Sequence, residues 1–217
     1  MQEHIAFVGG GNMASAILSG LLRQGVPISR IDVVEPDAQA RQKLQAQFGI
    51  EARARADSGL VQATVVVWAV KPQTFKEAAH QVRFFTKGAL HLSVAAGIRS
   101  DSIAHWLGNE RVIRSMPNTP ALIGKGITGL YARPAVSAAD RQVAQQVVHT
   151  TGDFVWFDAE AQLDAVTALS GSGPAYMFYF MEAMTDAGAD MGLPRDKAYE
   201  LAVATCIGAG ELARAST

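Results

Sequence analysis

The chain has 217 residues, of which 49% are hydrophobic and 18% charged, a balance typical of a globular protein with a well-filled core. Its formal net charge is −1 and it contains no basic tract, so the composition gives no reason to expect a nucleic-acid partner. No apolar stretch approaches the ~20 residues that a membrane-spanning helix needs.

The single cysteine, Cys206, excludes an intrachain disulfide. Small and apolar residues surround it, so we interpret it as a buried, inert thiol. The N-terminus passes directly into a strand-like run without a charged leader. Together these features predict a reducing, cytoplasmic location.

Short apolar runs alternate with segments of helical spacing through the first part of the chain. Strands are expected at residues 5–8, 31–34, 65–70, 89–94 and 111–116, and the runs at 127–131 and 154–157 are candidates to extend the sheet. The run at 65–70 is almost wholly apolar, as a parallel strand covered by helices on both faces should be. The alternation predicts an α/β fold with a Rossmann-like, doubly wound parallel sheet over residues 1–157.

The pattern is helical only from residue 158 onward. Two long segments begin at Pro174 and Pro194, each with proline near the first helical position. Their apolar side chains are spread around the helix circumference, so each needs burial on more than one side. We predict an all-α dimerisation domain over residues 158–217 that packs against a second subunit; packing on the first domain alone is the alternative.

A glycine-rich turn follows the first expected strand and precedes a helix of amphipathic spacing. Its sequence, Gly9-Gly10-Gly11-Asn12-Met13-Ala14, matches G-x-G-x-x-G/A. The first glycine permits the tight turn, and the second lets the backbone approach a pyrophosphate. The helix N-terminus adds free N–H groups for the anion. The turn predicts a dinucleotide cofactor contacted by Gly9, Gly10, Gly11, Asn12 and Met13.

Glu35 ends the second expected strand, where an acidic side chain normally bonds the ribose hydroxyls. This position favours NAD(H), because a carboxylate would repel a 2′-phosphate. Arg41 is a candidate to offset that repulsion, and Glu35 is alternatively a solvated turn residue beside Pro36. The sequence therefore leaves NADP(H) and NAD(H) both open.

Four further stretches follow the expected strands or open the helical domain. They are residues 69–72 (Ala-Val-Lys-Pro), 93–97 (Ser-Val-Ala-Ala-Gly), 114–120 (Arg-Ser-Met-Pro-Asn-Thr-Pro) and 170–176 (Ser-Gly-Ser-Gly-Pro-Ala-Tyr). In this order, and with the glycine-rich turn, they closely resemble the pyrroline-5-carboxylate reductases over essentially the whole chain. The resemblance implies NAD(P)H-dependent reduction of 1-pyrroline-5-carboxylate to L-proline, the last step of proline biosynthesis. It also implies a homodimer, which some relatives assemble into a decamer.

Site residues follow from the resemblance and from the rule that ligands bind beyond the carboxyl ends of parallel strands. Asn118 is expected to hold its amide against the nicotinamide or ribose, unless it only forms an Asx-type turn. Ser172 is also placed to cap the helix that follows it. Further cofactor-lining residues are expected at Ala69, Val70, Lys71, Pro72, Ala95, Ala96 and Gly97, with Lys71 near the ribose or solvated. Substrate-proximal residues are expected at Thr119, Ser172 and Gly173, and no metal is expected.

The sequence assigns no catalytic residue. An imine can take its proton from solvent, so the protein is expected mainly to orient the reactants and exclude water. The resemblance implies a Ser-Pro-Gly-Gly-Thr-Thr-like substrate loop beyond Thr217. We therefore expect the helical domain to be incomplete at its C-terminus and the 217-residue chain alone to be a poor catalyst.

Two other functions compete with this interpretation. A dehydrogenase of the β-hydroxyacid or prephenate type would place a lysine of the second domain near the nicotinamide. Lys197, the only lysine of that domain, lies too near a helix start to favour this role. A non-catalytic NAD(P) sensor would bind the cofactor tightly without imine turnover.

Overall fold

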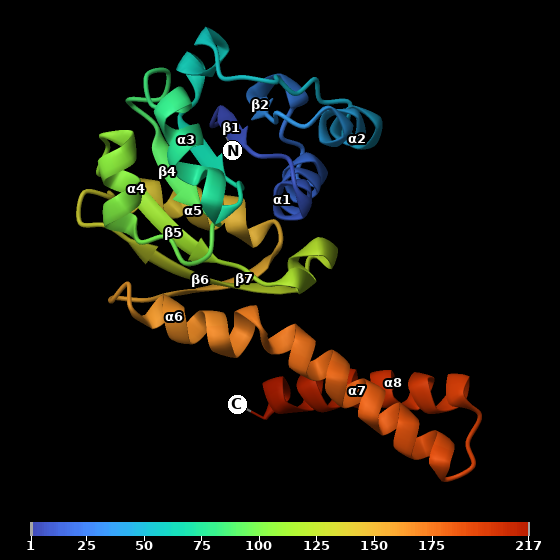
Figure 1. Cartoon of the computed structure of the whole chain (residues 1–217). Coiled ribbons are helices and arrows are strands. Elements are labelled where there is room, and N and C mark those ends of the chain that lie inside the picture. The colour runs from blue at the N-terminus through green and yellow to red at the C-terminus, as the bar shows by residue number, and fades with distance from the viewer. Residues whose placement is uncertain (1, 217) are drawn as a thin grey trace. The chain divides into compact units, whose positions relative to one another are not determined.

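The computed structural model describes residues 2–216, and the chain divides into two compact units, Met1–Gly171 and Ser172–Thr217 (Figure 1). Across the described residues, the first unit holds a seven-stranded sheet of order β2-β1-β3-β4-β5-β6-β7. The strands are β1 (Ile5–Val8), β2 (Ile31–Val34), β3 (Val65–Trp68), β4 (Leu90–Ser93), β5 (Val112–Met116), β6 (Gly126–Ala132) and β7 (Gly152–Trp156). Each of the apolar runs expected to form or extend the sheet contributes one of these strands, which confirms the α/β prediction.

Strand direction differs from the prediction at one side of the sheet. β1 to β5 are parallel, but β6 pairs antiparallel with β5, and β7 is parallel to β6. The expectation of a wholly parallel sheet is therefore wrong for β6 and β7. Only the short 3₁₀ helix η3 (Thr119–Ile123) separates β5 from β6, and a parallel crossover needs a connection of about a dozen residues or more.

Alternate side chains of the parallel strands point to opposite faces of the sheet. Ile5, Phe7, Val65 and Val67 belong to one apolar cluster together with residues of α1 and α5. Their neighbours along the strands form a second cluster with residues of α3 and α4, so both faces are covered. The helices of this unit include α1 (Asn12–Arg23), α2 (Ala38–Phe48), α3 (Pro72–Val82), α4 (Ser100–Leu107) and α5 (Ala138–His149).

Trp68 of β3 and His91 of β4 form a polar contact inside the second cluster. The Trp68 indole donates from Nε1 to Nδ1 of His91 at 3.1 Å, and both side chains are almost fully buried. Burial lowers the pKa of His91 to about 4, and the positive charge of Arg111 contributes to the same shift. His91 is therefore neutral in the folded protein at neutral pH, and its Nδ1 is an acceptor.

This histidine should make the first unit lose stability in mild acid. The unfolded chain takes up a proton near pH 6.5, whereas folded His91 resists protonation down to about pH 4. Stability is therefore full above pH 6.5 and falls as the pH is lowered towards 4, by about 3 kcal/mol from this group. Urea unfolding should show that the free energy of unfolding falls less between pH 7 and pH 5 in His91→Gln than in the wild-type protein. His80→Gln, at an exposed position of α3, should keep the wild-type loss; an unchanged loss in His91→Gln would contradict this account.

Helical structure begins earlier after the sheet than the sequence pattern indicates. α6 (Gln162–Val166) continues into a π-helical turn, Thr167–Gly171. The hydroxyls of Thr167 and Ser170 donate to the carbonyls of Leu163 and Val166 at 2.8 and 3.1 Å. The first residues of the stretch 170–176 are therefore helical, and the helical structure starts before Pro174. The division after Gly171 places α6 in the first unit, while the domain boundary at residue 158 stays a prediction.

The second unit consists of α7 (Gly173–Asp190) and α8 (Arg195–Ala215), close to the predicted helices. The two helices pack on each other through small residues, including Gly188 and Ala198. Cys206 is half-buried on α8 rather than buried as expected, because α7 covers only one side of α8 within this unit. Within residues 2–216 no helix is both long and apolar enough to cross a membrane.

Candidate cofactor-binding site

The loops predicted to bind the cofactor emerge from one edge of the sheet. β1 to β5 are parallel, so their carboxyl ends lie along the same edge. The loops that follow β1, β3 and β4 carry Gly9–Met13, Ala69–Pro72 and Ala95–Gly97. This edge is where open α/β sheets bind their ligands.

Gly9 lies where the loops after β1 and β3 meet. Its φ is +95°, and its N–H donates to the carbonyl of Val34 at 2.8 Å. A Cβ at this position would lie 2.5 Å from the carbonyl oxygen of Ala69 and 3.0 Å from the nitrogen of Val70. Both the backbone conformation and the close approach to Ala69 therefore require glycine here.

The N-terminus of α1 is open to an anion. Gly11 occupies the N-cap position without a side-chain cap, and the first turn carries no acidic residue. Gly11 and Asn12 are exposed, Met13 is half-buried, and a Cβ added to Gly11 would meet no atom within 4 Å. The uncapped N–H groups and the helix dipole together fit the pyrophosphate of a dinucleotide.

Glu35 reaches back under the glycine-rich turn. Its Oε2 accepts the N–H of Gly10 at 2.7 Å, and its Oε1 accepts the N–H of Asp37 at 2.8 Å. A Cβ on Gly10 would lie 2.6 Å from Cδ1 of Leu44. Glu35 is therefore a half-buried brace of the turn and not the freely solvated residue considered as an alternative.

A cavity of about 360 Å³ lies between this turn and α2. Its charged lining residues are Asp37 and Lys43. Arg41, considered as an offset to Glu35, donates from NH1 to the main-chain carbonyls of Glu35 at 2.9 Å and Pro36 at 2.6 Å. NH1 of Arg41 is therefore hydrogen-bonded to the backbone and not to the carboxylate of Glu35.

The loops after β3 and β4 differ in exposure. Lys71 is the exposed N-cap residue of α3 and Pro72 is its first residue, while Ala69 and Val70 are half-buried. In the loop after β4, Ala95 is buried, and Ala96 and Gly97 are exposed. Contact of these loops with a cofactor remains a prediction.

Asn118 uses its side-chain amide within the first unit. Nδ2 donates to the carbonyl of Ser170 at 3.2 Å, and Oδ1 accepts the N–H of Ile127 at 3.0 Å. The side chain therefore ties the start of β6 to the π-helical turn. The following residue, Thr119, is exposed at the start of η3.

Ser172 and Gly173 open the second unit. Ser172 is the N-cap residue of α7 but makes no side-chain cap hydrogen bond, so the expected capping role is wrong. Its φ and ψ of −87° and −17° are helical, whereas a capping side chain requires extended backbone geometry. The role of both residues near a substrate remains a prediction.

A buried ionic cluster escaped the sequence analysis. Arg114 of β5 donates to Oε1 of Glu160 at 2.7 Å, and both side chains are buried. Glu160 also accepts the N–H of Ser100 at 2.6 Å and its hydroxyl at 2.7 Å. Burial alone would raise the pKa of Glu160, but the hydrogen bonds from Ser100 and Arg114 outweigh it and lower the pKa. An arginine inside an apolar strand run was the one signal that a buried acid had to lie nearby.

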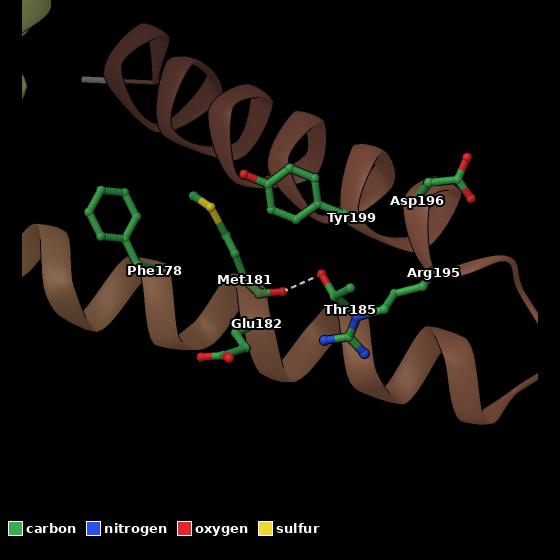
Figure 2. A pocket seen from close by; sticks show the side chains of 7 residues that line it. All are labelled: Phe178, Met181, Glu182, Thr185, Arg195, Asp196 and Tyr199. Atoms are coloured by element: carbon green, nitrogen blue, oxygen red, sulfur yellow. Dashed lines mark hydrogen bonds between the residues drawn. The ribbon is translucent and has the colours of Figure 1, made fainter.

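The second unit has a cavity of its own, of about 610 Å³, between α7 and α8 (Figure 2). Phe178, Met181 and Tyr199 supply its apolar lining, and Thr185 uses its hydroxyl on the carbonyl of Met181 at 2.7 Å. Lys197 forms an exposed ion pair with Glu200 in the first turns of α8. Within residues 2–216 no group of three or more His, Cys, Asp or Glu side chains is placed to hold a metal ion.

The doubly wound sheet and its glycine-rich turn define a dinucleotide-binding protein of the NAD(P)-dependent oxidoreductase class. Two family models match the chain: "NADP oxidoreductase coenzyme F420-dependent" over residues 4–97 and "Pyrroline-5-carboxylate reductase dimerisation" over residues 160–217. The pyrroline-5-carboxylate reductase of Pseudomonas aeruginosa is 46% identical over 98% of this chain and 78% of the relative. That of Pisum sativum is 38% identical over the same shares. The chain belongs to the pyrroline-5-carboxylate reductase family.

Solved structures agree with this assignment. The pyrroline-5-carboxylate reductase of Coxiella burnetii superimposes with a TM-score of 0.91 at 34% identity, covering 98% of this chain and 80% of that chain. Prephenate dehydrogenase from A. aeolicus matches with a TM-score of 0.65 at 14% identity, covering 100% and 89%. The second similarity shows a shared fold alone and does not favour the prephenate-type alternative.

Proposed function

We propose that this protein is a pyrroline-5-carboxylate reductase, which reduces 1-pyrroline-5-carboxylate to L-proline with NAD(P)H in the last step of proline biosynthesis. The observation that carries the proposal is the 46% identity to the Pseudomonas aeruginosa reductase over 98% of the chain. The open N-terminus of α1 behind the glycine-rich turn supports use of the cofactor.

A bound nicotinamide cofactor would supply the hydride that reduces the imine carbon. The backbone of Gly9, Gly10 and Gly11, with Asn12 and Met13, holds the pyrophosphate at the start of α1. The exposed parts of the loops 69–72 and 95–97, together with Asn118, position the rest of the cofactor along the sheet edge. Thr119, Ser172 and Gly173 lie near the substrate, whose nitrogen takes its proton from solvent. The contribution of these residues is orientation and exclusion of water.

Loss of absorbance at the reduced-nicotinamide band, with 1-pyrroline-5-carboxylate as substrate, tests this function. We expect turnover by the complete gene product with NADH or NADPH, and no loss of absorbance when the substrate is omitted. Cofactor binding without turnover would contradict the proposal and favour a sensor. Reduction of NAD(P)⁺ with prephenate or a β-hydroxyacid would favour the other enzyme class.

The second unit supports a homodimer. Apolar side chains on α7 are strongly exposed within the chain, with Phe178 at 64% and Tyr179 at 75% of their full surface. Residues 160–217 match the dimerisation model of the family. Burial of this surface on a second copy would remove it from water. A decamer of five dimers is the larger assembly that we propose, and it rests on the family resemblance.

The proposed partner is therefore a small molecule, 1-pyrroline-5-carboxylate, and the proposed location is the cytoplasm. A lone cysteine, Cys206, supports a reducing compartment. The net charge of −1 supports the absence of a nucleic-acid partner.

A further inference from the structure

Glu35 follows directly after β2 and lies against the glycine-rich turn, the position at which such folds bind the adenosine ribose. Oε2 accepts the N–H of Gly10 at 2.7 Å, and Oε1 accepts the N–H of Asp37 at 2.8 Å. The carboxylate is thus held at both oxygens on a half-buried side chain. Each oxygen keeps a further lone pair, so the group can still accept hydrogen bonds from hydroxyls.

The other charged side chains near the turn carry both signs. Asp37 adds a second carboxylate, which lines the cavity and caps α2 by accepting the N–H of Ala40 at 2.7 Å. Arg41 binds two main-chain carbonyls through NH1, and neither Arg41 nor Glu35 is among the residues that line the cavity. Lys43 lines the cavity from further along α2. The side chain that hydrogen-bonds the glycine-rich turn is therefore an anion.

We propose that Glu35 makes this protein prefer NADH to NADPH. The 2′- and 3′-hydroxyls of an unphosphorylated ribose donate to the carboxylate, as expected of an acid at the end of the second strand of such a fold. A 2′-phosphate carries close to two negative charges at neutral pH and is almost fully deprotonated, so it cannot donate a hydrogen bond to a carboxylate. Glu35 and Asp37 therefore repel it. The inference rests on the proposed use of a nicotinamide cofactor and adds which of the two forms is selected.

Binding measured without the imine substrate tests the proposal independently of catalysis. The change in nicotinamide fluorescence gives dissociation constants for NADH and NADPH, and competition by ADP-ribose and 2′-phospho-ADP-ribose isolates the adenosine end. We expect NADH to bind at least tenfold more tightly than NADPH, and ADP-ribose more tightly than its 2′-phosphate. In Glu35→Gln and Glu35→Ser the ratio of the NADPH to the NADH dissociation constant should fall at least tenfold, and the ratio for 2′-phospho-ADP-ribose and ADP-ribose should fall likewise.

A matched control separates this local effect from a change in net charge. Glu77→Gln removes one carboxylate from the exposed face of α3 and should leave the ratio unchanged. Thermal unfolding of each variant shows whether the fold is retained. If the Glu35 variants fail to fold, the NADH and NADPH dissociation constants of the wild-type protein decide whether NADH is preferred.

Two results would overturn the inference. One is equal or tighter binding of NADPH by the wild-type protein. The other is a parallel loss of both affinities in the folded Glu35 variants with an unchanged ratio, which would make Glu35 only a brace of the turn. A preference for NADH without imine turnover would instead defeat the proposed function and leave this inference standing.

Discussion

Glu160→Gln is expected to lower the free energy of unfolding of the first unit by about 3 kcal/mol, because it leaves the guanidinium of Arg114 buried without its counter-charge. The Arg114 and Glu160 side chains expose only 6% and 8% of their surface, so water cannot replace the lost partner. Ser100, which donates twice to the Glu160 carboxylate, would also meet a neutral amide. The cost therefore combines a buried unpaired charge with weakened hydrogen bonds.

Urea unfolding followed by tryptophan fluorescence measures this change in the first unit alone. Trp68, Trp106 and Trp156 are the chain's three tryptophans, and all lie in Met1–Gly171. Glu110→Gln is the matched control, since Glu110 pairs with Arg133 near the same cluster but is 62% exposed. Such an exposed pair should contribute less than about 1 kcal/mol.

Two further measurements test the cause. Arg114→Met combined with Glu160→Gln should recover part of the loss, because no charge is then left buried without a partner. The pKa of Glu160 is lowered on folding, so its contribution is present above about pH 4.5 and is lost as the pH falls through the folded value. The difference in free energy of unfolding between the wild type and Glu160→Gln should therefore become smaller in acid. A loss no greater than that of Glu110→Gln would show that the buried pair does not stabilise the unit.

The parallel core of the sheet could be predicted from the sequence because burial on both faces demands apolar residues along the whole strand. Val65–Trp68 is such a strand, and all of its residues are buried. The direction of β6 could not be predicted in this way. Direction depends on the connection, and the segment between β5 and β6 folds into a short 3₁₀ helix with no crossover helix.

The glycine-rich turn was predicted well for a related reason. Gly9 has a positive φ, and a Cβ built on it would lie 2.5 Å from the carbonyl oxygen of Ala69. Only glycine is compatible with both features. The amide of Asn118 and the carboxylate of Glu35 were harder to place, because each bonds a residue far away in the sequence. Asn118 reaches Ser170, and Glu35 reaches Gly10, through contacts that only the folded chain creates.

Ser172 shows the limit of local rules. Serine before a helix that starts with Gly173-Pro174 is typical of a cap, yet the chain is already helical when it reaches Ser172. The preceding π-helical turn sets that geometry, and it is held by hydroxyl bonds to carbonyls one turn earlier. Residue preference alone could not reveal that the backbone is already helical at Ser172.

Gly9→Ala is expected to lower the free energy of unfolding of the first unit by about 3 kcal/mol or more and to abolish dinucleotide binding. The new Cβ would lie 2.5 Å from the carbonyl oxygen and 2.7 Å from the carbonyl carbon of Ala69, so the loops after β1 and β3 must separate. Such a shift costs about 1–3 kcal/mol. The φ of +95° adds about 1–2 kcal/mol of backbone strain. Since the same turn positions the N-terminus of α1, its displacement should remove the anion site.

Gly25→Ala separates these two causes. Gly25 has a similar φ of +82°, but a Cβ there would meet no atom within 4 Å. It should therefore cost only the strain, about 1–2 kcal/mol, and leave NADH and NADPH binding unchanged. Urea unfolding by tryptophan fluorescence and cofactor titration on the same samples would compare the variants. Equal losses of stability, with binding retained in both, would mean that the loops can move apart at no cost and that contact between the Gly9 turn and Ala69 is not what shapes the site.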